Sequence, residues 1–207
     1  RHHSNNNLSE IKRISNLSEK YLAILGTPML FFALLYAEEI IELLLGSAFL
    51  PASWIFRILL TLSYIRMIFT SYIVNLAATG YPLLVGKIGV FVTVLNIILS
   101  VLLIPKSLLG VNLFNYGALG ASIATFSATA VGIIIHMYYS SKLNRTTSYP
   151  GTIFILIFGF FSIYVSHNIM EIMHFNLYFN LLSVFIVSLL FYIILLYIFK
   201  IIGKKEI

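Results

Sequence analysis

The sequence predicts an all-α fold, a polytopic membrane bundle of about six transmembrane helices. The chain has 207 residues, of which 60% are hydrophobic and only 10% are charged, and its mean hydropathy is +0.99. Soluble domains carry about 25% charged residues, so this chain has too little polar surface to be surrounded by water. Its apolar residues also fall into six long runs, and roughly 20 apolar residues in a helix cross a hydrocarbon core about 30 Å thick.

Each apolar run is bounded by residues that begin or end helices. Ser53 opens the second run, Gly80 and Pro82 end it, and Pro105 closes the third. A polar loop containing Pro150 separates the fourth run from the fifth, and a short polar turn separates the fifth from the sixth. The expected helices cover residues 20–45, 53–79, 83–104, 116–140, 152–170 and 177–202.

The chain is expected to have three parts. Residues 1–19 form a polar, cytosolic segment that is partly helical from about Ser9. Residues 20–140 form four transmembrane helices, and residues 141–207 form a cytosolic loop followed by two closing transmembrane helices.

The basic residues predict how the bundle is oriented. Of the 13 Lys and Arg residues, ten lie in the termini and in the connections after the second and fourth helices. One, Lys106, lies on the opposite side, and Arg57 and Arg66 lie within the second helix. Cytosolic loops carry the excess of Lys and Arg, so we expect a multi-pass protein of the plasma membrane with both ends in the cytosol. Three acidic residues at the far end of the first helix then face outward: Glu38, Glu39 and Glu42.

Composition and motifs argue against several functions. The net charge of +6 comes from residues near the ends of apolar spans, so nucleic acid is not an expected partner. The chain contains no Cys and no Asp, and no phosphate loop, Ser/His/acid set or metal-ligand spacing is present. We therefore expect a transporter with no catalytic residue, metal or cofactor. Three histidines near helix ends are interpreted as interfacial or hydrogen-bonded: His136, His167 and His174.

The fourth helix carries small residues at four-residue steps. One row is Gly117, Ala121, Thr125 and Thr129, and the other is Gly120, Ala124, Ala128 and Gly132. Small side chains let membrane helices approach closely, so these rows predict tight packing against a neighbouring helix, with a sliding surface as the alternative.

The second helix carries the candidate substrate site. At about 100° per residue, Arg57, Tyr64, Ser71 and Asn75 fall within about 40° of one another, which predicts a polar stripe. Arg66 points nearly opposite, near the middle of the membrane. An arginine within a span costs about 3 kcal/mol, so each guanidinium needs a cavity, a counter-charge or an anionic ligand.

The two arginines differ in the partners available to them. Arg57 either pairs with an acidic residue at the outer end of the first helix or faces a cavity, whereas a functional role is favoured for Arg66. Asn96 in the third helix either forms an interhelical hydrogen bond or lines a cavity. The candidate substrate-binding residues are Arg57, Tyr64, Arg66, Ser71, Asn75, Lys87 and Asn96.

Several short motifs occur in a characteristic order over about residues 20 to 140. They are Leu43-Leu44-Leu45-Gly46, then Phe49, Ala52 and Arg57-Ile58-Leu59, then Ala78-Thr79-Gly80 with Pro82 and Lys87, then Asn96, Leu99 and Leu103-Ile104-Pro105, and finally Gly117-Ala118-Leu119-Gly120-Ala121-Ser122-Ile123-Ala124-Thr125. In this order and spacing they resemble the polysaccharide biosynthesis (oligosaccharide-lipid flippase) family, which belongs to the same superfamily as multidrug exporters.

The resemblance implies the second lobe of a flippase of 12 to 14 helices. It also implies a substrate, an oligosaccharide on a polyprenyl phosphate or pyrophosphate, that crosses the membrane by alternating access for surface glycan assembly. Arg57, Arg66 and Lys87 would bind its phosphate. The implied partners are membrane lipids, the lipid-linked glycan and a first lobe. Because the sequence does not begin with Met, we expect a fragment that lacks this lobe.

Two other functions remain open. A cation-coupled multidrug exporter usually needs acidic residues in the membrane, whereas the acids here are expected in the polar tails, at the outer end of the first helix and at Glu171. A non-transporting scaffold subunit of glycan export is the other alternative, and only the absent first lobe favours it.

Overall fold

The computed structural model describes residues 5–108, 110–171 and 177–201, and this part of the chain is almost entirely helical. The helices are α1 (Asn5–Leu35), α2 (Ala37–Leu45), α3 (Ser53–Ala78), α4 (Pro82–Leu103), α5 (Gly117–Asn144), α6 (Thr152–Glu171) and α7 (Leu177–Ile198). A 3-10 helix, Ser47–Ala52, joins α2 to α3, and β1 (Ser107–Leu108) pairs antiparallel with β2 (Val111–Asn112). Six helices in the described ranges are long and apolar enough to span a membrane, which confirms the predicted polytopic bundle.

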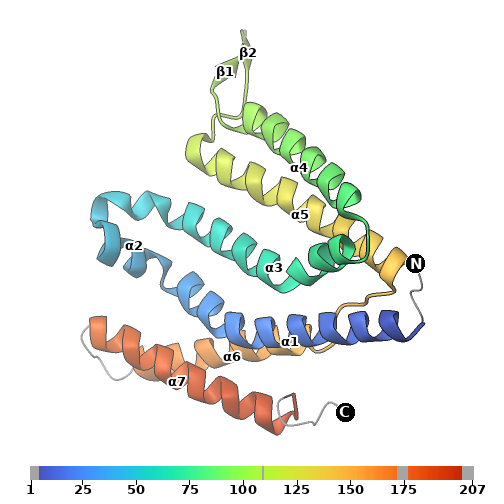
Figure 1. Cartoon of the computed structure of the whole chain (residues 1–207). Helices are drawn as coiled ribbons and strands as arrows, with labels where there is room; N and C mark the ends of the chain where they lie inside the picture. Colours follow the sequence, from blue (N-terminus) through green and yellow to red (C-terminus); the bar gives the residue numbers. More distant parts are fainter. Residues whose placement is uncertain (1–4, 109, 172–176, 202–207) are drawn as a thin grey trace.

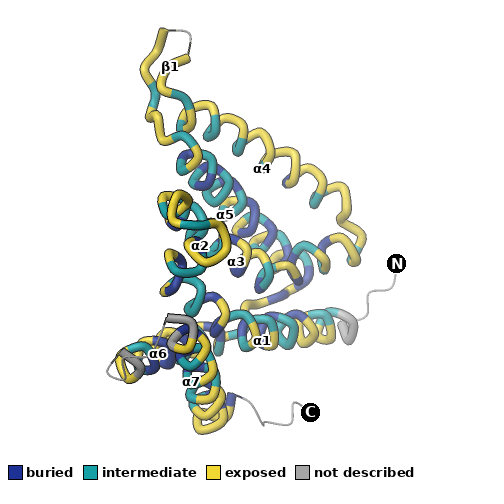
Figure 2. Tube along the Cα trace, turned by 90° about the vertical axis from the view of Figure 1, so that its left-hand side faces the viewer, coloured by how far each residue is buried: buried dark blue, intermediate teal, exposed yellow. Residues whose placement is uncertain are grey.

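The long helix α1 lies between two groups of helices (Figure 1). On one side it packs against α3, which packs against α5, and α5 in turn packs against α4. On its other side α1 packs against α6, which pairs with α7. The helix α4 lies at the margin of the first group; most of its residues are exposed, and Ile88 is the one that is buried (Figure 2). The group α3–α4–α5 contains all seven candidate substrate-binding residues.

The first span differs from the expected helix at both ends. It was expected over residues 20–45, but α1 already begins at Asn5 and stops at Leu35. The polar stretch before residue 20, which was expected to be partly helical from about Ser9, is helical from residue 5, and Ser15 and Glu19 within it are buried against other helices. At Tyr36 the backbone leaves helical geometry (φ −99°, ψ 30°), and α2 continues the span from Ala37.

The predicted packing role of the small residues in α5 is confirmed for one of the two rows. Gly120, Ala124, Ala128 and Gly132 are all buried. A Cβ atom at Gly120 would lie 2.6 Å from the backbone oxygen of Leu103, and one at Gly132 would lie 2.5 Å from a methyl group of Val92. The row therefore brings the backbones of α4 and α5 close together, the usual source of attraction between membrane helices.

The substitution Gly120→Ala is expected to weaken this seam. The added methyl group meets a backbone atom that cannot move aside, so we expect a loss of about 1–3 kcal/mol of stability. The measurement is thermal unfolding of the purified protein in detergent. Gly86→Ala in α4 is the matched control, because nothing lies within 4 Å of a Cβ there. Equal unfolding midpoints for the two variants would contradict the proposed seam.

Candidate functional site

The helix α3 presents polar groups on two sides, and one of these sides faces α1. The Tyr64 hydroxyl shares a hydrogen bond of 2.6 Å with the hydroxyl of Thr27, and Asn75 Nδ2 donates to Ser15 Oγ. Ser71 is buried between them along the same face. The expected stripe thus exists, but the structure places Tyr64, Ser71 and Asn75 in the interface with α1 rather than in a cavity. For Tyr64 and Asn75, the physical reason is that α1 supplies matching polar groups at this interface.

Arg57, on the same face of α3, is bound to the break between α1 and α2. Its Nη1 and Nη2 atoms both lie 3.2 Å from Oε1 of Glu38, and its Nε donates to the backbone oxygen of Leu34 over 3.2 Å. The guanidinium also lies 5.0 Å from the ring centre of Trp54. Of the two alternatives for Arg57, the structure contains the ion pair with an acidic residue of the first span.

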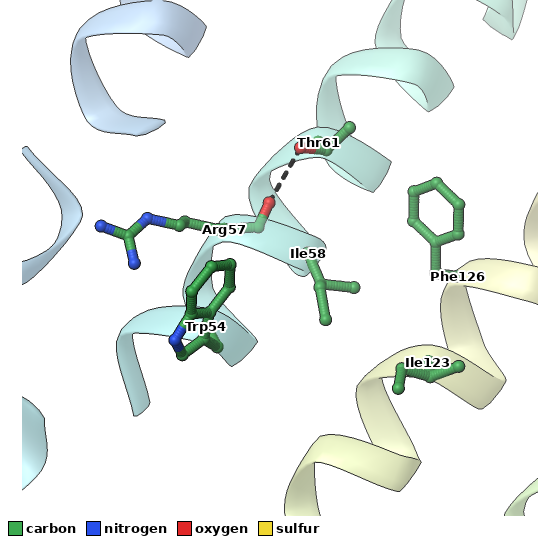
Figure 3. Close-up of a pocket in the computed structure, with 6 residues that line it drawn as sticks. All are labelled: Trp54, Arg57, Ile58, Thr61, Ile123 and Phe126. Atoms are coloured by element: carbon green, nitrogen blue, oxygen red, sulfur yellow. Dashed lines mark hydrogen bonds between the residues drawn. The ribbon is translucent and has the colours of Figure 1, made fainter. Parts of the chain in front are cut away.

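A small apolar pocket of about 320 Å³ lies beside Arg57, between α3 and α5 (Figure 3). Ile58, Ile123 and Phe126 point into it, while the guanidinium of Arg57 points away toward α1 and α2. Thr61 adds a hydroxyl that donates to the Arg57 backbone oxygen over 2.9 Å. This pocket therefore offers no cation to an anionic ligand.

Arg66 faces the opposite way, into a hollow of about 680 Å³ between α3, α4 and α5. Its side chain is exposed and has no hydrogen bond or ion pair within the described part of the chain. The hollow is also lined by polar residues from all three helices: Ser63, Thr70, Asn96, Thr125, Thr129 and His136. An unpaired guanidinium and several polar groups thus share one hollow, which suits an anionic ligand that carries hydroxyl groups.

Asn96 and Lys87, the two candidates on α4, have different positions. Asn96 lines the hollow, and its Oδ1 accepts a hydrogen bond of 3.1 Å from Ser100 one turn further along the same helix. Its observed bond is therefore within α4 rather than between helices, and the cavity-lining alternative describes its position. Lys87 is exposed near the start of α4 and is not among the residues that line the hollow.

His136 was expected to be interfacial or hydrogen-bonded rather than a ligand, and the structure places it in the wall of the hollow. Its Nδ1 lies 2.7 Å from the backbone oxygen of Gly132, while its Nε2 is buried and has no partner among the described residues. The sequence did contain a signal, because Thr125, Thr129, Gly132 and His136 follow one another at steps of four, three and four residues, which places them on one helix face. The other two histidines of the three interpreted from sequence are His167, whose Nδ1 lies 2.9 Å from the Tyr36 hydroxyl, and His174, which lies outside the described residues.

Glu19 is a second residue that sequence reasoning missed. It was assigned to a cytosolic segment, but its side chain is fully buried inside the helix of the first candidate span. Its Oε1 accepts hydrogen bonds from Ser148 (2.6 Å) and Thr152 (2.8 Å), and its Oε2 accepts one from Tyr72 (3.3 Å). Glu19 thus connects α1, α3 and the start of α6, through contacts more than 50 residues apart in the sequence.

The fold and the hollow define a multi-pass membrane protein with a cationic, hydroxyl-lined recess inside its helix bundle. No family model matches the chain, and no solved structure matches it either. The chain is 29% identical over 139 residues to the probable low-salt glycan biosynthesis flippase Agl15 of Haloferax volcanii. The matched region covers 67% of this chain and only 28% of that relative. This similarity supports a glycan-related transporter rather than an enzyme, in line with the family that the motifs resemble.

Proposed function

We propose that this chain is one lobe of a flippase that moves a lipid-linked glycan across the plasma membrane. The phosphate or pyrophosphate of the lipid passes beside Arg66, and the polyprenyl chain stays in the surrounding bilayer. The observation that carries the proposal is the unpaired guanidinium of Arg66, which faces a polar hollow in the middle of a membrane-spanning helix.

The energetic cost of an arginine within a membrane span supports this assignment. Arginine in the middle of a span costs about 3 kcal/mol, and in most membrane proteins such residues face a cavity or a partner. Arg57 has a counter-charge in Glu38, whereas Arg66 has none among the described residues. A phosphate group accepts two parallel hydrogen bonds from one guanidinium, so it would supply the missing partner during transport.

The mechanism we propose is alternating access by two lobes, of which this chain supplies one. The relative is much longer than the matched region, which leaves room for a first lobe that closes the hollow from the other side. With both chain ends in the cytosol, Lys87 lies at the inner end of α4, where it would attract the head group before Arg66 binds it. An inside-negative potential favours outward movement of the anion by about 2.3 kcal/mol per charge per 100 mV.

Removal of the whole protein from its host tests this function. We expect the lipid-linked glycan to accumulate in the cytosolic leaflet while glycan at the cell surface falls. Extraction of the lipids and lectin labelling of intact cells measure the two pools. Surface glycan at the level of the parent strain would contradict the proposal.

Glu19 favours a second candidate function, a cation-coupled exporter. Such exporters use acidic residues within the membrane, and Glu19 is a buried carboxyl group inside a candidate span. In that case, loss of the protein would increase sensitivity to toxic compounds and leave the lipid-linked glycan pool unchanged. The same deletion strain therefore separates the two candidates.

A further inference from the structure

The wall of the Arg66 hollow contains a nitrogen atom whose hydrogen-bonding role can be assigned. His136 is only 7% exposed, and its Nδ1 lies 2.7 Å from the backbone oxygen of Gly132. A carbonyl oxygen can only accept a hydrogen bond, so Nδ1 must carry the proton and donate it. In the neutral ring, the other nitrogen, Nε2, is then an acceptor with a free lone pair.

Packing alone does not explain this histidine. Nε2 is buried and has no partner among the described residues, and leaving such a group unpaired costs about 1–3 kcal/mol. A phenylalanine of similar size would fill the same space without that cost. Because the ring forms part of the wall of the hollow, a ligand bound in the hollow can supply the missing donor.

Two of the hydroxyl groups that line the hollow, those of Ser63 and Thr125, have the same hydrogen-bonding character. Ser63 Oγ donates to the backbone oxygen of Leu59 over 2.8 Å, and Thr125 Oγ1 donates to that of Ala121 over 2.9 Å. Since their protons are already used, both hydroxyl groups present acceptors to the hollow. The hollow thus combines one cation, Arg66, with acceptors on three of its lining residues: the hydroxyl oxygens of Ser63 and Thr125 and the ring of His136. Phosphate oxygens would be repelled by these acceptors, but sugar hydroxyl groups would donate to them.

We propose that His136 is a specificity-determining residue that accepts a hydrogen bond from a sugar hydroxyl while Arg66 binds the phosphate next to that sugar. The hollow then selects a glycosyl polyprenyl phosphate over the bare lipid phosphate, so that a carrier without its glycan is not moved. Its volume of about 680 Å³ lies within the range of roughly 300–1,000 Å³ that is usual for small-ligand sites. This inference rests on the proposed flippase function.

The test is binding of two probes to the full-length protein in lipid nanodiscs. One probe is a polyprenyl phosphate, and the other is the same lipid with one glucose on its phosphate. His136→Phe keeps an aromatic ring of similar size and removes both ring nitrogens, including the acceptor, so we expect about tenfold weaker binding of the glucosylated lipid and little change for the bare phosphate. His136→Gln, which restores an acceptor oxygen, is expected to recover most of the lost affinity.

Other outcomes separate this inference from the proposed function. Equal weakening of both probes by His136→Phe would mean that His136 binds the phosphate, and no change in either would make it structural; both results overturn the inference. Arg66→Ala should weaken the binding of both probes, and if it weakens the binding of neither, the proposed function fails as well.

A second measurement uses the wild-type protein, so it does not depend on the folding of a variant. Glucose 1-phosphate should displace the glucosylated lipid at about tenfold lower concentration than inorganic phosphate. Equal potency would overturn the inference.

Discussion

Replacement of Arg66 by alanine is expected to abolish glycan export while membrane insertion stays intact. The substitution removes the unpaired guanidinium of the hollow, so an anionic head group would meet no cation in the middle of the bundle. Insertion should not suffer, because the loss of an arginine from a span makes the span more apolar. The measurements are surface glycan on intact cells and the amount of protein in the membrane fraction.

The matched control for this prediction is Arg57→Ala in the same helix. The Arg57 guanidinium is already occupied by Glu38 and by the backbone oxygen of Leu34, so we expect only a partial loss of export. Arg66→Lys keeps the charge but loses the paired hydrogen bonds, and should give an intermediate result. Export at the wild-type level in Arg66→Ala would remove Arg66 from the mechanism. Complete loss in Arg57→Ala would mean that the two roles are exchanged.

Replacement of Glu19 by alanine is expected to cause the largest loss of stability among the substitutions considered. The change leaves the hydroxyl groups of Tyr72 and Thr152, both buried residues, without their acceptor, and it also removes the partner of the exposed Ser148. Each buried unsatisfied group costs about 1–3 kcal/mol, so the two buried hydroxyl groups alone give an expected loss of about 2 kcal/mol or more. Thermal or denaturant unfolding of the purified protein in detergent measures it.

Two controls make the Glu19 prediction specific. Glu19→Gln keeps the volume and one acceptor oxygen, and should lose much less stability than the alanine variant. Glu38→Ala removes an acidic residue whose side chain is 57% exposed, and loss of such a surface ion pair typically costs about 0–1 kcal/mol. If Glu19→Ala were no less stable than Glu38→Ala, the buried hydrogen bonds of Glu19 would contribute little to the fold.

The membrane spans could be predicted from sequence because their signals are local. Long apolar runs predict the six spans, and Pro82 and Pro105 mark the boundaries of α4 closely. The start of α1 could not be predicted in this way. Ser15 and Glu19 make that stretch look like a polar tail, and their partners, such as Asn75 and Thr152, are remote in the sequence. The break between α1 and α2 at Tyr36 could not be predicted either, because no proline or glycine lies at that position.

The candidate site was only partly predictable for a related reason. Helical periodicity correctly places Arg57 and Arg66 on opposite sides of one helix, but it cannot say which neighbours those sides meet. The stripe with Tyr64 and Asn75 looked like a cavity wall because its partners on α1 are invisible to periodicity. The role of His136 could not be predicted either, because its Nε2 can be recognised as buried and without a partner among the described residues only when the packing around it is known.

The two attachments of the first span respond differently to the surrounding electrolyte. Near Tyr36, Glu38 of this span forms an ion pair with Arg57 of α3. Water and dissolved ions can reach the Glu38 carboxylate, so added salt weakens this ion pair. At Glu19, deep in the protein, mobile ions have no access and screening is slight. Concentrated salt is therefore expected to weaken the contact between α2 and α3 through Glu38 while the hydrogen bonds of Glu19 are little affected.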